Sequence, residues 1–423
     1  MRRWIYLGAG SGVVLAVAAW LAGALPSGDP AGWTVSYVAG LVCWVAGGTG
    51  IAFAWIKADA PLWLKAAWAL PLVFSPPLGS RDIYAYACQG WLWLNGFDPY
   101  TTGVANAGCP WTEAVPPLWW HTPTPYGPFA IALEGLAAWT GSLLGSMVVL
   151  RALAIAGAVI VAWALPRFAE RPDALLLGVV TPLVAVHGIS GAHNDMLVAA
   201  GIVGALAAAH ARRPAVAGVA VGLAVAIKVT AIVALPFLLI MLGKRWWATF
   251  LAGVASFGAV TLATGLGLGW VDALRHTGEL TQWSSVPTAV GMAIGYLTGP
   301  QAIPIARALG LIVLAGIGVA LLRMAWRDRD RAVEACAWML VATALLGPVF
   351  YPWYALVPLG VLAAVRVHRK ILLITTLICT FLTLPNGQGI PALTKAPGAY
   401  AVTAILVGVA IRTVRRRRPG PAA

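Results

Sequence analysis

The chain has 423 residues, of which 60% are hydrophobic and only 10% are charged. A soluble domain normally carries about 25% charged residues, so this composition excludes an ordinary soluble enzyme, a disordered chain and a nucleic-acid-binding module. The net charge is +14. We expect this excess to mark the loops that stay in the cytoplasm, because cytoplasmic loops of membrane proteins are rich in Lys and Arg.

The N-terminal part predicts three membrane-spanning helices. A bilayer core needs about 20 apolar residues per helix, and apolar runs occupy roughly 4–25, 33–56 and 61–78. The first run follows two arginines, as in a signal peptide, but it is longer than the usual apolar region of about 7–15 residues. We therefore expect residues 1–60 to hold two extra N-terminal spans that stay in the protein.

The next segment, 79–147, is predicted to be an outer loop with surface-lying or re-entrant helices. Its apolar run 128–145 carries a central Glu134, which is unfavourable in a span that faces lipid. Cys88 and Cys109 both lie in this loop. A disulfide between them is chemically possible outside the cytoplasm, and the sequence leaves their pairing open.

Residues 148–412 are predicted to form the rest of a helical bundle, followed by a basic cytoplasmic tail over 413–423. Its apolar runs lie near 148–166, 174–189, 196–210, 214–228, 230–243, 247–268, 303–324, 333–349, 352–365, 371–385 and 398–412. If the basic clusters between the runs face the cytoplasm, the chain crosses the membrane about 14 times (13–14) with both termini inside. The predicted fold class is therefore all-α, as a single polytopic membrane domain over 1–423.

Two segments predict helices that break inside the membrane. The apolar residues 214–242 have a basic pair on each side, and a single span would place one pair outside. Two short helices that break near Lys228 keep both pairs inside. Segment 333–365 repeats this design, with its break at Gly347–Tyr354. Irregular backbone at membrane depth is tolerated where it lines a cavity, so the two breaks predict one cavity that opens outward.

Few polar residues belong to the outer half of the molecule, and each has a structural alternative to a functional role. Asp82, next to Arg81, is either a catalytic carboxylate or a helix cap with an ion pair. His193, Asn194 and Asp195 form either part of a site or an ordinary polar turn.

Two basic residues and one aromatic cluster complete the outer candidates. Lys228 lies in an apolar stretch, where lysine is costly and functional by default, although a lysine near a helix end can extend to the surface. Arg151 begins a span on the outer side and is expected to bind an anion. Tyr351, Trp353 and Tyr354 either stack on a sugar or belong to the aromatic belt.

The remaining candidate residues are weaker, and the motifs for metal and nucleotide binding are absent from the sequence. His121 and His276 lie in outer loops, where solvated or structural roles explain them equally well. The five cysteines show no metal-binding spacing, and we predict no metal and no cofactor. The cytoplasmic loops are short and lack nucleotide-phosphate motifs. An enzyme on this scaffold would therefore act outside and draw its energy from an activated lipid.

Five stretches make the chain resemble a known family. They are SRDIYAYACQGWLWLNGFDPYTTG (Ser80–Gly103), HTPTPYGP (His121–Pro128), SGAHNDM (Ser190–Met196), AIKVTA (Ala226–Ala231) and PVFYPWY (Pro348–Tyr354). From about 61 to 412 the chain resembles the actinobacterial α-1,6-mannopyranosyltransferases that use polyprenyl-phosphate mannose, which belong to the GT-C superfamily of multi-spanning glycosyltransferases. The first two spans lie outside this matched part.

The resemblance implies a GT-C fold and a set of site residues. An essential acid at the start of the outer loop falls on Asp82, and donor-phosphate binding falls on Arg151 and Lys228. The residues expected to bind the sugar or the acceptor are Arg81, Tyr84, His193, Asn194, Asp195, Tyr351, Trp353 and Tyr354.

The implied reaction transfers mannose, with inversion, to the 6-OH of an α-mannan acceptor of the lipomannan or lipoarabinomannan type. It would take place at the outer face of the plasma membrane, with the donor lipid, the mannan or lipoglycan acceptor and the bilayer as partners and no nucleic acid. Asp82 would act as general base, while Lys228 and Arg151 would stabilise the leaving phosphate.

Three other functions stay open at this stage. A GT-C transferase for another polyprenyl-phosphate sugar, such as arabinofuranose, fits the same sequence. A polyprenyl-lipid flippase or secondary transporter would also use broken helices and a central lysine. The third alternative, a structural membrane subunit, explains the fewest features of the sequence, because it gives no reason for the positions of Arg81, Asp82 and Lys228.

Overall fold

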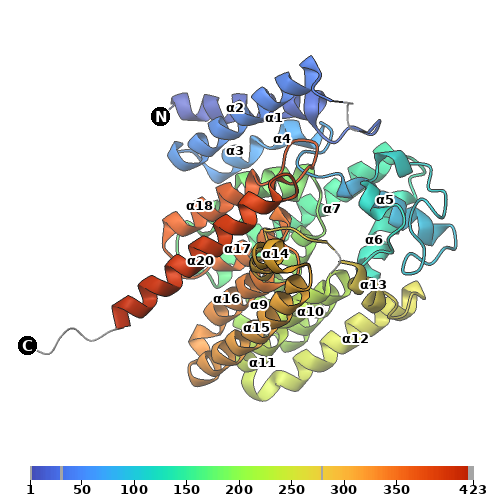
Figure 1. Ribbon diagram of the computed structural model, residues 1–423. Helices are drawn as coiled ribbons and strands as arrows, with labels where there is room; N and C mark the ends of the chain where they lie inside the picture. Colours follow the sequence, from blue (N-terminus) through green and yellow to red (C-terminus); the bar gives the residue numbers. More distant parts are fainter. Residues whose placement is uncertain (1, 29–31, 278–279, 418–423) are drawn as a thin grey trace, which may run out of the picture.

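The structure, a computed structural model, describes residues 2–28, 32–277 and 280–417. This part of the chain folds into helices and turns without any β-strand (Figure 1). The all-α prediction is therefore confirmed, and long apolar helices among these residues identify a multi-pass membrane protein.

The N-terminal helices form a separate layer along one side of the molecule (Figure 1). Helices α1 (Arg2–Ala22) and α2 (Val35–Lys57) pack against each other and lie over the short helices α3 (Leu62–Ala67) and α4 (Leu70–Val73). Small residues allow the close approach of α1 and α2. The predicted span over 61–78 is not one continuous helix, because the helix is interrupted after Ala67 and three prolines follow in the sequence. Its crossing of the membrane stays a prediction.

The predicted outer segment holds two helices that pack together, α5 (Asp82–Leu94) and α6 (Pro128–Ala138). They have 13 and 11 residues, about 20 Å at most with a rise of 1.5 Å per residue, so neither crosses a bilayer core of ~30 Å alone. Between them lie the 3₁₀ turns Thr112–Ala114 and Pro117–Trp119.

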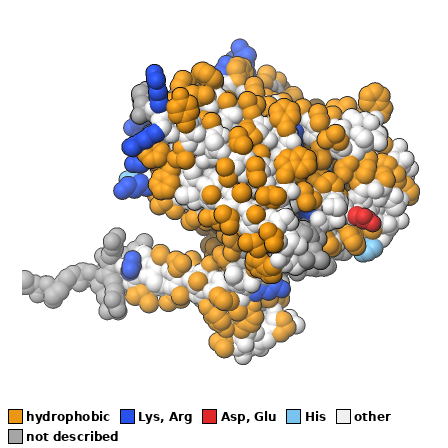
Figure 2. All heavy atoms as spheres, turned by 90° about the horizontal axis from the view of Figure 1, so that it is seen from above, with side chains coloured by type: hydrophobic (Ala, Val, Ile, Leu, Met, Phe, Trp, Pro, Cys, Tyr) orange, Lys and Arg blue, Asp and Glu red, His pale blue; other side chains and the backbone are white. Residues whose placement is uncertain are grey.

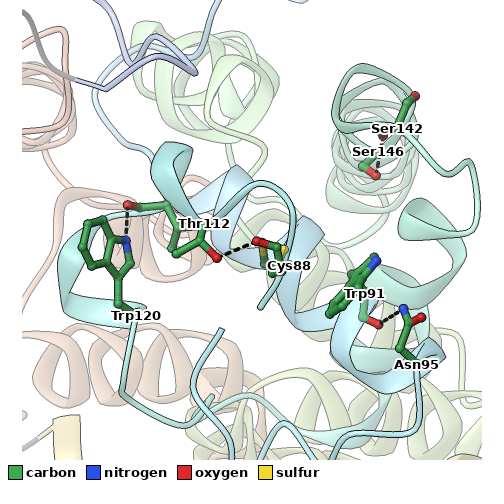
Figure 3. Close-up of a disulfide and its surroundings, with 9 residues drawn as sticks. Cys88, Trp91, Asn95, Thr112, Trp120, Ser142 and Ser146 are labelled. Carbon is green, nitrogen blue, oxygen red and sulfur yellow. Dashed lines mark hydrogen bonds between the residues drawn. A yellow bond between two sulfur atoms is a disulfide. The ribbon is translucent and has the colours of Figure 1, made fainter. Parts of the chain in front are cut away.

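A disulfide joins Cys88 of α5 to Cys109 in the following loop, with Cα atoms 5.8 Å apart (Figure 3). The pairing that the sequence left open is therefore present. It fixes the loop onto the helix that begins with Asp82.

The central bundle surrounds α9 (Asp195–His210), which is buried along nearly its whole length. A π-helix (Val184–Ser190) precedes it, after α8 (Ala174–Gly178). The neighbours of α9 are α7 (Leu143–Ala164), α10 (Pro214–Ile227), α11 (Leu235–Leu242) and α17 (Leu356–Leu362).

The remaining helices surround this bundle (Figure 1). They are α12 (Trp246–Thr264), α13 (Trp270–Thr277), α14 (Val286–Thr298), α15 (Ala302–Arg327), α16 (Ala332–Leu346), α18 (Arg369–Thr380), α19 (Ile390–Leu393) and α20 (Lys395–Arg417). Helix α14 was not predicted, because it lies between the predicted apolar runs 247–268 and 303–324. Its 13 residues are too few for the length criterion of a span.

Both predicted breaks are confirmed. Helix α10 ends at Ile227, and Lys228 has extended backbone with φ −148° and ψ 121° before a 3₁₀ turn over Val229–Ala234. At the second break α16 ends at Leu346, and a 3₁₀ turn over Pro352–Ala355 leads into α17.

Six helices of the described chain are long and apolar enough to cross a membrane, or seven if the π-helix and α9 count as one bent span. Several other predicted crossings consist of shorter helices, such as α10 and α14. The number of 14 crossings therefore stays a prediction.

Charge is unevenly distributed over the surface. Figure 2 shows Lys and Arg side chains gathered mainly on its left, the side where α1 begins in Figure 1, while acidic side chains appear towards the right. In Figure 1 the right side carries α5 and α6.

Candidate functional site

The site is built around a sharp corner between the π-helix and α9, whose axes differ by 106°. At the corner Ala192 has φ +49°, in the left-handed region that non-glycine residues seldom adopt. His193, Asn194 and Asp195 follow at once, and all three are buried. Strained backbone and π-helices are both concentrated at functional sites, so this corner is the first place to seek chemistry.

An ion pair connects the corner to the first helix break. The ammonium Nζ of Lys228 lies 2.8 Å from Oδ1 of Asp195. It also lies 3.7 Å from the ring centroid of Tyr354, where the aromatic face attracts a cation. Since Tyr354 belongs to the second break, the two breaks meet at this lysine.

Asp82 reaches the same cluster from the start of α5. Its Oδ1 accepts a hydrogen bond from Trp119 Nε1 at 3.3 Å, and its Oδ2 lies 3.8 Å from His193 Nδ1. Burial raises the pKa of Asp82 from 3.8 to about 6, while the Trp119 hydrogen bond and the charge of Lys228 act in the opposite direction. A carboxylate with such a pKa is suited to proton transfer near neutral pH.

Aromatic rings form one wall of the cluster. The His193 ring stacks on Trp353 with centroids 3.9 Å apart, and Trp353 stacks on Tyr351 with centroids 4.7 Å apart. Nδ1 of His193 lies 3.1 Å from the hydroxyl of Tyr86. The stack holds the imidazole in a fixed orientation beside Asp82.

Two buried polar atoms of the cluster, His193 Nε2 and Asp195 Oδ2, have no hydrogen-bond partner among the described residues. Buried polar atoms are usually hydrogen-bonded. The position of these two atoms in the cluster therefore suits the binding of a polar group such as a sugar hydroxyl or a phosphate oxygen.

Asn194, the middle residue of the three at the corner, contacts α6. Asn194 Nδ2 donates to Oε1 of the fully buried Glu134 at 2.9 Å. From the sequence, Glu134 was predicted only to bear on topology, and Tyr86 and Trp119 were not among the predicted site residues. The sequence signal that could have identified Glu134 as a site residue is an acidic residue in the middle of an apolar run.

Arg151 binds the backbone carbonyl of the last π-helix residue, Ser190, next to the corner, and the carbonyl of Val73 in α4. Its Nε and Nη2 donate to the Ser190 carbonyl at 3.2 and 3.0 Å, and its Nη1 donates to the Val73 carbonyl at 2.7 Å. Arg151 therefore braces the segment that leads into the corner. None of these hydrogen bonds joins Arg151 to the cluster of Asp82 and Lys228.

Two predicted sugar-binding residues are also engaged with the backbone. Arg81 Nε donates to the Ala114 carbonyl at 2.9 Å, and the Tyr84 hydroxyl donates to the Ala24 carbonyl at 2.6 Å. These bonds fasten the start of α5 to its surroundings and so position Asp82.

The two weaker histidine candidates lie elsewhere. His121 Nδ1 lies 2.6 Å from Asn106 Oδ1 in an exposed part of the outer segment. The backbone of His276 belongs to α13, and its side chain lies outside the described residues.

An apolar groove of about 510 Å³ passes beside the corner. It runs between α3 and α4 on one side and α7, α8 and the π-helix on the other. Its lining includes Trp63, Val73 and Ile189. Since Arg151 binds the carbonyls of Val73 and Ser190, this arginine connects the groove wall to the start of the corner.

Comparison with known proteins identifies two matching family models. Residues 5–244 match the model described as "Alpha-(1->6)-mannopyranosyltransferase, N-terminal domain". Residues 280–412 match "MptB C-terminal domain". The match includes α1 and α2, so the motif-based limit at about residue 61 was too narrow.

Three curated relatives illustrate the similarity. "Alpha-(1->6)-mannopyranosyltransferase A" of Mycobacterium tuberculosis is 31% identical over 72% of this chain and 64% of the relative. A "Probable alpha-(1->6)-mannopyranosyltransferase" of Mycolicibacterium smegmatis is 30% identical, over 84% of this chain and 75% of the relative. "Alpha-(1->6)-mannopyranosyltransferase A" of Corynebacterium glutamicum is 29% identical over 68% and 67%.

The chain thus spans just under two thirds of the length of the M. tuberculosis relative. No solved structure matches it.

Proposed function

The chain belongs to the α-(1→6)-mannopyranosyltransferase family, and we propose that it is an inverting mannosyltransferase. It would move mannose from polyprenyl-phosphate mannose to the 6-OH of an α-mannan acceptor of the lipomannan or lipoarabinomannan type. The observation that carries this proposal is the buried cluster in which Asp82, His193 and the Asp195–Lys228 ion pair meet.

Within this cluster Asp82 is the better general base. Asp195 lies 2.8 Å from the ammonium of Lys228 and is engaged in this ion pair. The carboxylate of Asp82 accepts a hydrogen bond from Trp119 and lies 3.8 Å from His193. It is therefore the carboxylate that can take the proton from an acceptor hydroxyl.

The reaction needs one displacement. The acceptor oxygen forms a bond to C1 of a β-linked mannosyl phosphate, the C1–O bond to phosphate breaks, and the hydroxyl proton goes to Asp82. The leaving polyprenyl phosphate gains negative charge. Lys228 stabilises it, because an ammonium has three donors and can bind Asp195 and a phosphate oxygen at the same time.

Arg151 and the apolar groove suit the lipid part of the donor. The guanidinium has five N–H groups, and the two carbonyls take three of them, which leaves two for the donor phosphate. The groove next to it offers apolar walls for an isoprenoid chain.

The proposal includes a GT-C fold with about 14 crossings, both termini in the cytoplasm and a site that faces the outside of the plasma membrane. The disulfide between Cys88 and Cys109 supports an outer position for this loop, because disulfides persist in oxidising compartments. Tyr351 would contact the sugar through the ring face that does not stack on Trp353, and Trp353, stacked between His193 and Tyr351, would hold this ring in place.

Family membership favours a mannosyltransferase over a flippase or a structural subunit. Another polyprenyl-phosphate sugar, such as arabinofuranose, is the alternative within the same enzyme class, because sugar choice depends on the shape of the pocket.

The test uses purified full-length protein, polyprenyl-phosphate mannose and a short α-1,6-mannoside. We expect a new α-1,6 linkage from the wild type, strongly reduced turnover by Asp82→Asn and Lys228→Met, and wild-type turnover by Asp272→Asn, which removes an exposed acid paired with Arg275. EDTA should have no effect.

Full activity of Asp82→Asn would overturn the assignment of the base. Preference for the arabinofuranosyl donor in a competition assay would overturn the choice of sugar. Lipid translocation in liposomes without any new glycosidic bond would overturn the enzyme class.

A further inference from the structure

A second groove lies far from the Asp82 cluster, between the end of α11, the start of α12 and the last turns of α15. These helix ends lie at the bottom of Figure 1, whereas α5 and α6 lie at the upper right. The groove has a volume of about 810 Å³.

The walls of this groove are apolar. They are formed by Pro236, Leu239, Ile240, Val319 and Leu322, with Trp246 and Trp326. Val319 and Trp326 are 48% and 75% exposed, so the groove is open along the side of the molecule. Tryptophans of this kind lie at the level of the lipid head groups in membrane proteins.

The cations of the groove come from three elements. Lys244 lies in the turn before α12, Arg323 and Arg327 lie on α15, and Arg329 lies in the turn that follows. All four are exposed, and none has an acidic partner within the described chain.

Two acids lie close to these cations without an ion pair to any of the four within the described residues. Asp328 lines an adjoining hollow with Arg323 and Arg327, but it lies outside the groove lining, and its Oδ1 accepts a hydrogen bond from the Asp330 N–H. Arg323 and Arg327 are four residues apart on one face of α15, where like charges destabilise a helix. An anion bound between them would remove this repulsion.

A glycine leaves room for the side chain of one of these arginines. Gly243 has φ +54°, and a Cβ at this position would overlap Nη1 of Arg329. The guanidinium therefore lies directly against the backbone at the end of α11. The left-handed backbone favours glycine here, and the Arg329 side chain would have to move to admit a Cβ.

We propose that this groove binds an anionic phospholipid from the leaflet at this end of the molecule. Its acyl chains would lie along the apolar wall between α11 and α15, and its phosphate would bind Lys244, Arg323, Arg327 and Arg329. Basic pockets between membrane helices on the cytoplasmic side bind such head groups, and guanidinium groups bind phosphate oxygens in pairs. The bound lipid would join α11 and α12 to α15.

The first test compares two lipids on the wild-type protein. Purified full-length protein in mild detergent receives phosphatidylglycerol or phosphatidylcholine with the same acyl chains. We expect phosphatidylglycerol to be retained in native mass spectrometry and to raise the unfolding temperature, and phosphatidylcholine to do neither. Equal effects of the two lipids would overturn the proposal. So would equal protection by inorganic phosphate, which would identify a free-phosphate site.

The second test changes the charges. The double variant Arg323→Gln/Arg327→Gln should bind phosphatidylglycerol more weakly, by roughly five-fold per removed cation. Its matched control, Arg2→Gln/Arg412→Gln, removes the same charge from exposed positions elsewhere and should bind like the wild type. Equal loss in the two double variants would show general charge attraction and overturn the site.

A third variant keeps every charge. Gly243→Ala should displace Arg329 and weaken phosphatidylglycerol binding. Gly265→Ala imposes the same left-handed strain at φ +69° with open space around it and should leave lipid binding unchanged. Unchanged lipid binding by a folded Gly243→Ala would contradict the assigned position of Arg329.

Discussion

Asp82 and Asp195 lie in the same buried cluster and differ mainly in their nearest cation. Asp195 is 2.8 Å from Lys228, whereas Asp82 is 3.8 Å from the buried imidazole of His193. The two acids should therefore respond differently to the same change.

Asp82→Asn is expected to lower kcat by about 10²–10⁴, because it removes the group that takes the acceptor proton. Its unfolding temperature should change little, because the substituted amide has almost the same size. Asp195→Asn should instead destabilise the fold by roughly 3–5 kcal/mol, because it leaves the Lys228 ammonium unpaired in a buried site. Turnover and thermal unfolding of both variants check this difference.

The activity should depend on pH through Asp82. Since the base acts in its deprotonated form and its pKa is about 6, kcat/KM should fall as the pH decreases through this value. Trp119→Phe removes a hydrogen bond that lowers the pKa, so its profile should shift to higher pH. A profile of Asp272→Asn serves as the control, and an identical midpoint in Trp119→Phe would contradict the assignment.

The same pKa has a consequence for stability. Because folding raises the pKa from 3.8 to about 6, the protonated form is favoured in the folded state. This contribution to stability is complete below about pH 3.8 and is lost as the pH rises through about 6.

Sequence could identify part of this cluster because a charge in an apolar chain is costly and therefore informative. Lys228 was predicted in this way. Asp82 was predicted from the family resemblance, and Asp195 as part of either a site or a polar turn. The structure places Lys228 beside Asp195 and Asp82 beside His193. Tyr86 and Trp119 were missed because they are ordinary residues of an aromatic-rich loop, and their partners are 107 and 37 residues away. The backbone acceptors of Arg151 leave no trace in a sequence.

At the scale of elements, the sequence predicted where helices break, but it did not predict which helices pack against each other. Basic pairs on both sides of 214–242 required a chain reversal, and α10 ends one residue before Lys228. Nothing in the local sequence indicated that α5 and α6 pack with their backbones in contact. That contact depends on Gly90, where a Cβ would overlap the carbonyl of Glu134.

Gly90→Ala should therefore lower the free energy of unfolding by about 1–3 kcal/mol, since the two helices must separate or strain. Gly204→Ala is the matched control, because this glycine also lies in a helix and has open space around it. Thermal unfolding of the two variants in detergent tests the prediction. Equal stability of both would show that α5 and α6 adapt without cost.

The disulfide should stabilise the outer segment by constraining the unfolded chain. Cys88→Ala/Cys109→Ala is expected to cost roughly 2–4 kcal/mol, and a reducing agent should lower the unfolding temperature of the wild type to a similar extent. Cys43→Ala, at a free and partly exposed cysteine, should retain the response to reduction. A reduction-insensitive wild type would show that this crosslink contributes nothing to stability.

At the scale of the whole molecule, the charge distribution predicts orientation. The end that carries the basic groove and the basic helix termini should face the cytoplasm, and α5 and α6 should face outward. In intact cells, a membrane-impermeant maleimide should label Thr101→Cys but not Asp330→Cys, both of which are exposed positions. After cell lysis both should react. Labelling of Asp330→Cys in intact cells would reverse the proposed topology.

The apolar length of a segment predicts the long membrane-spanning helices well and the short, bent ones poorly. Helices such as α1, α2 and α15 satisfy the criterion of about 20 apolar residues and were predicted within a few residues. The segments near the site are shorter and bent, because they turn to place polar groups. For them, apolar length alone does not say whether the chain crosses the membrane.

The ion pair between Asp195 and Lys228 also bears on how the protein is made. A ribosome delivers Asp195 33 residues before its partner, on a helix whose surface is almost entirely covered by other helices in the finished protein. At that moment α9 has neither its counter-ion nor α17. Helices α9 and α10 should therefore enter the membrane together, as a hairpin that neutralises its own charge. A chain halted before Lys228 would present the insertion machinery with an acid that has nothing to pair with.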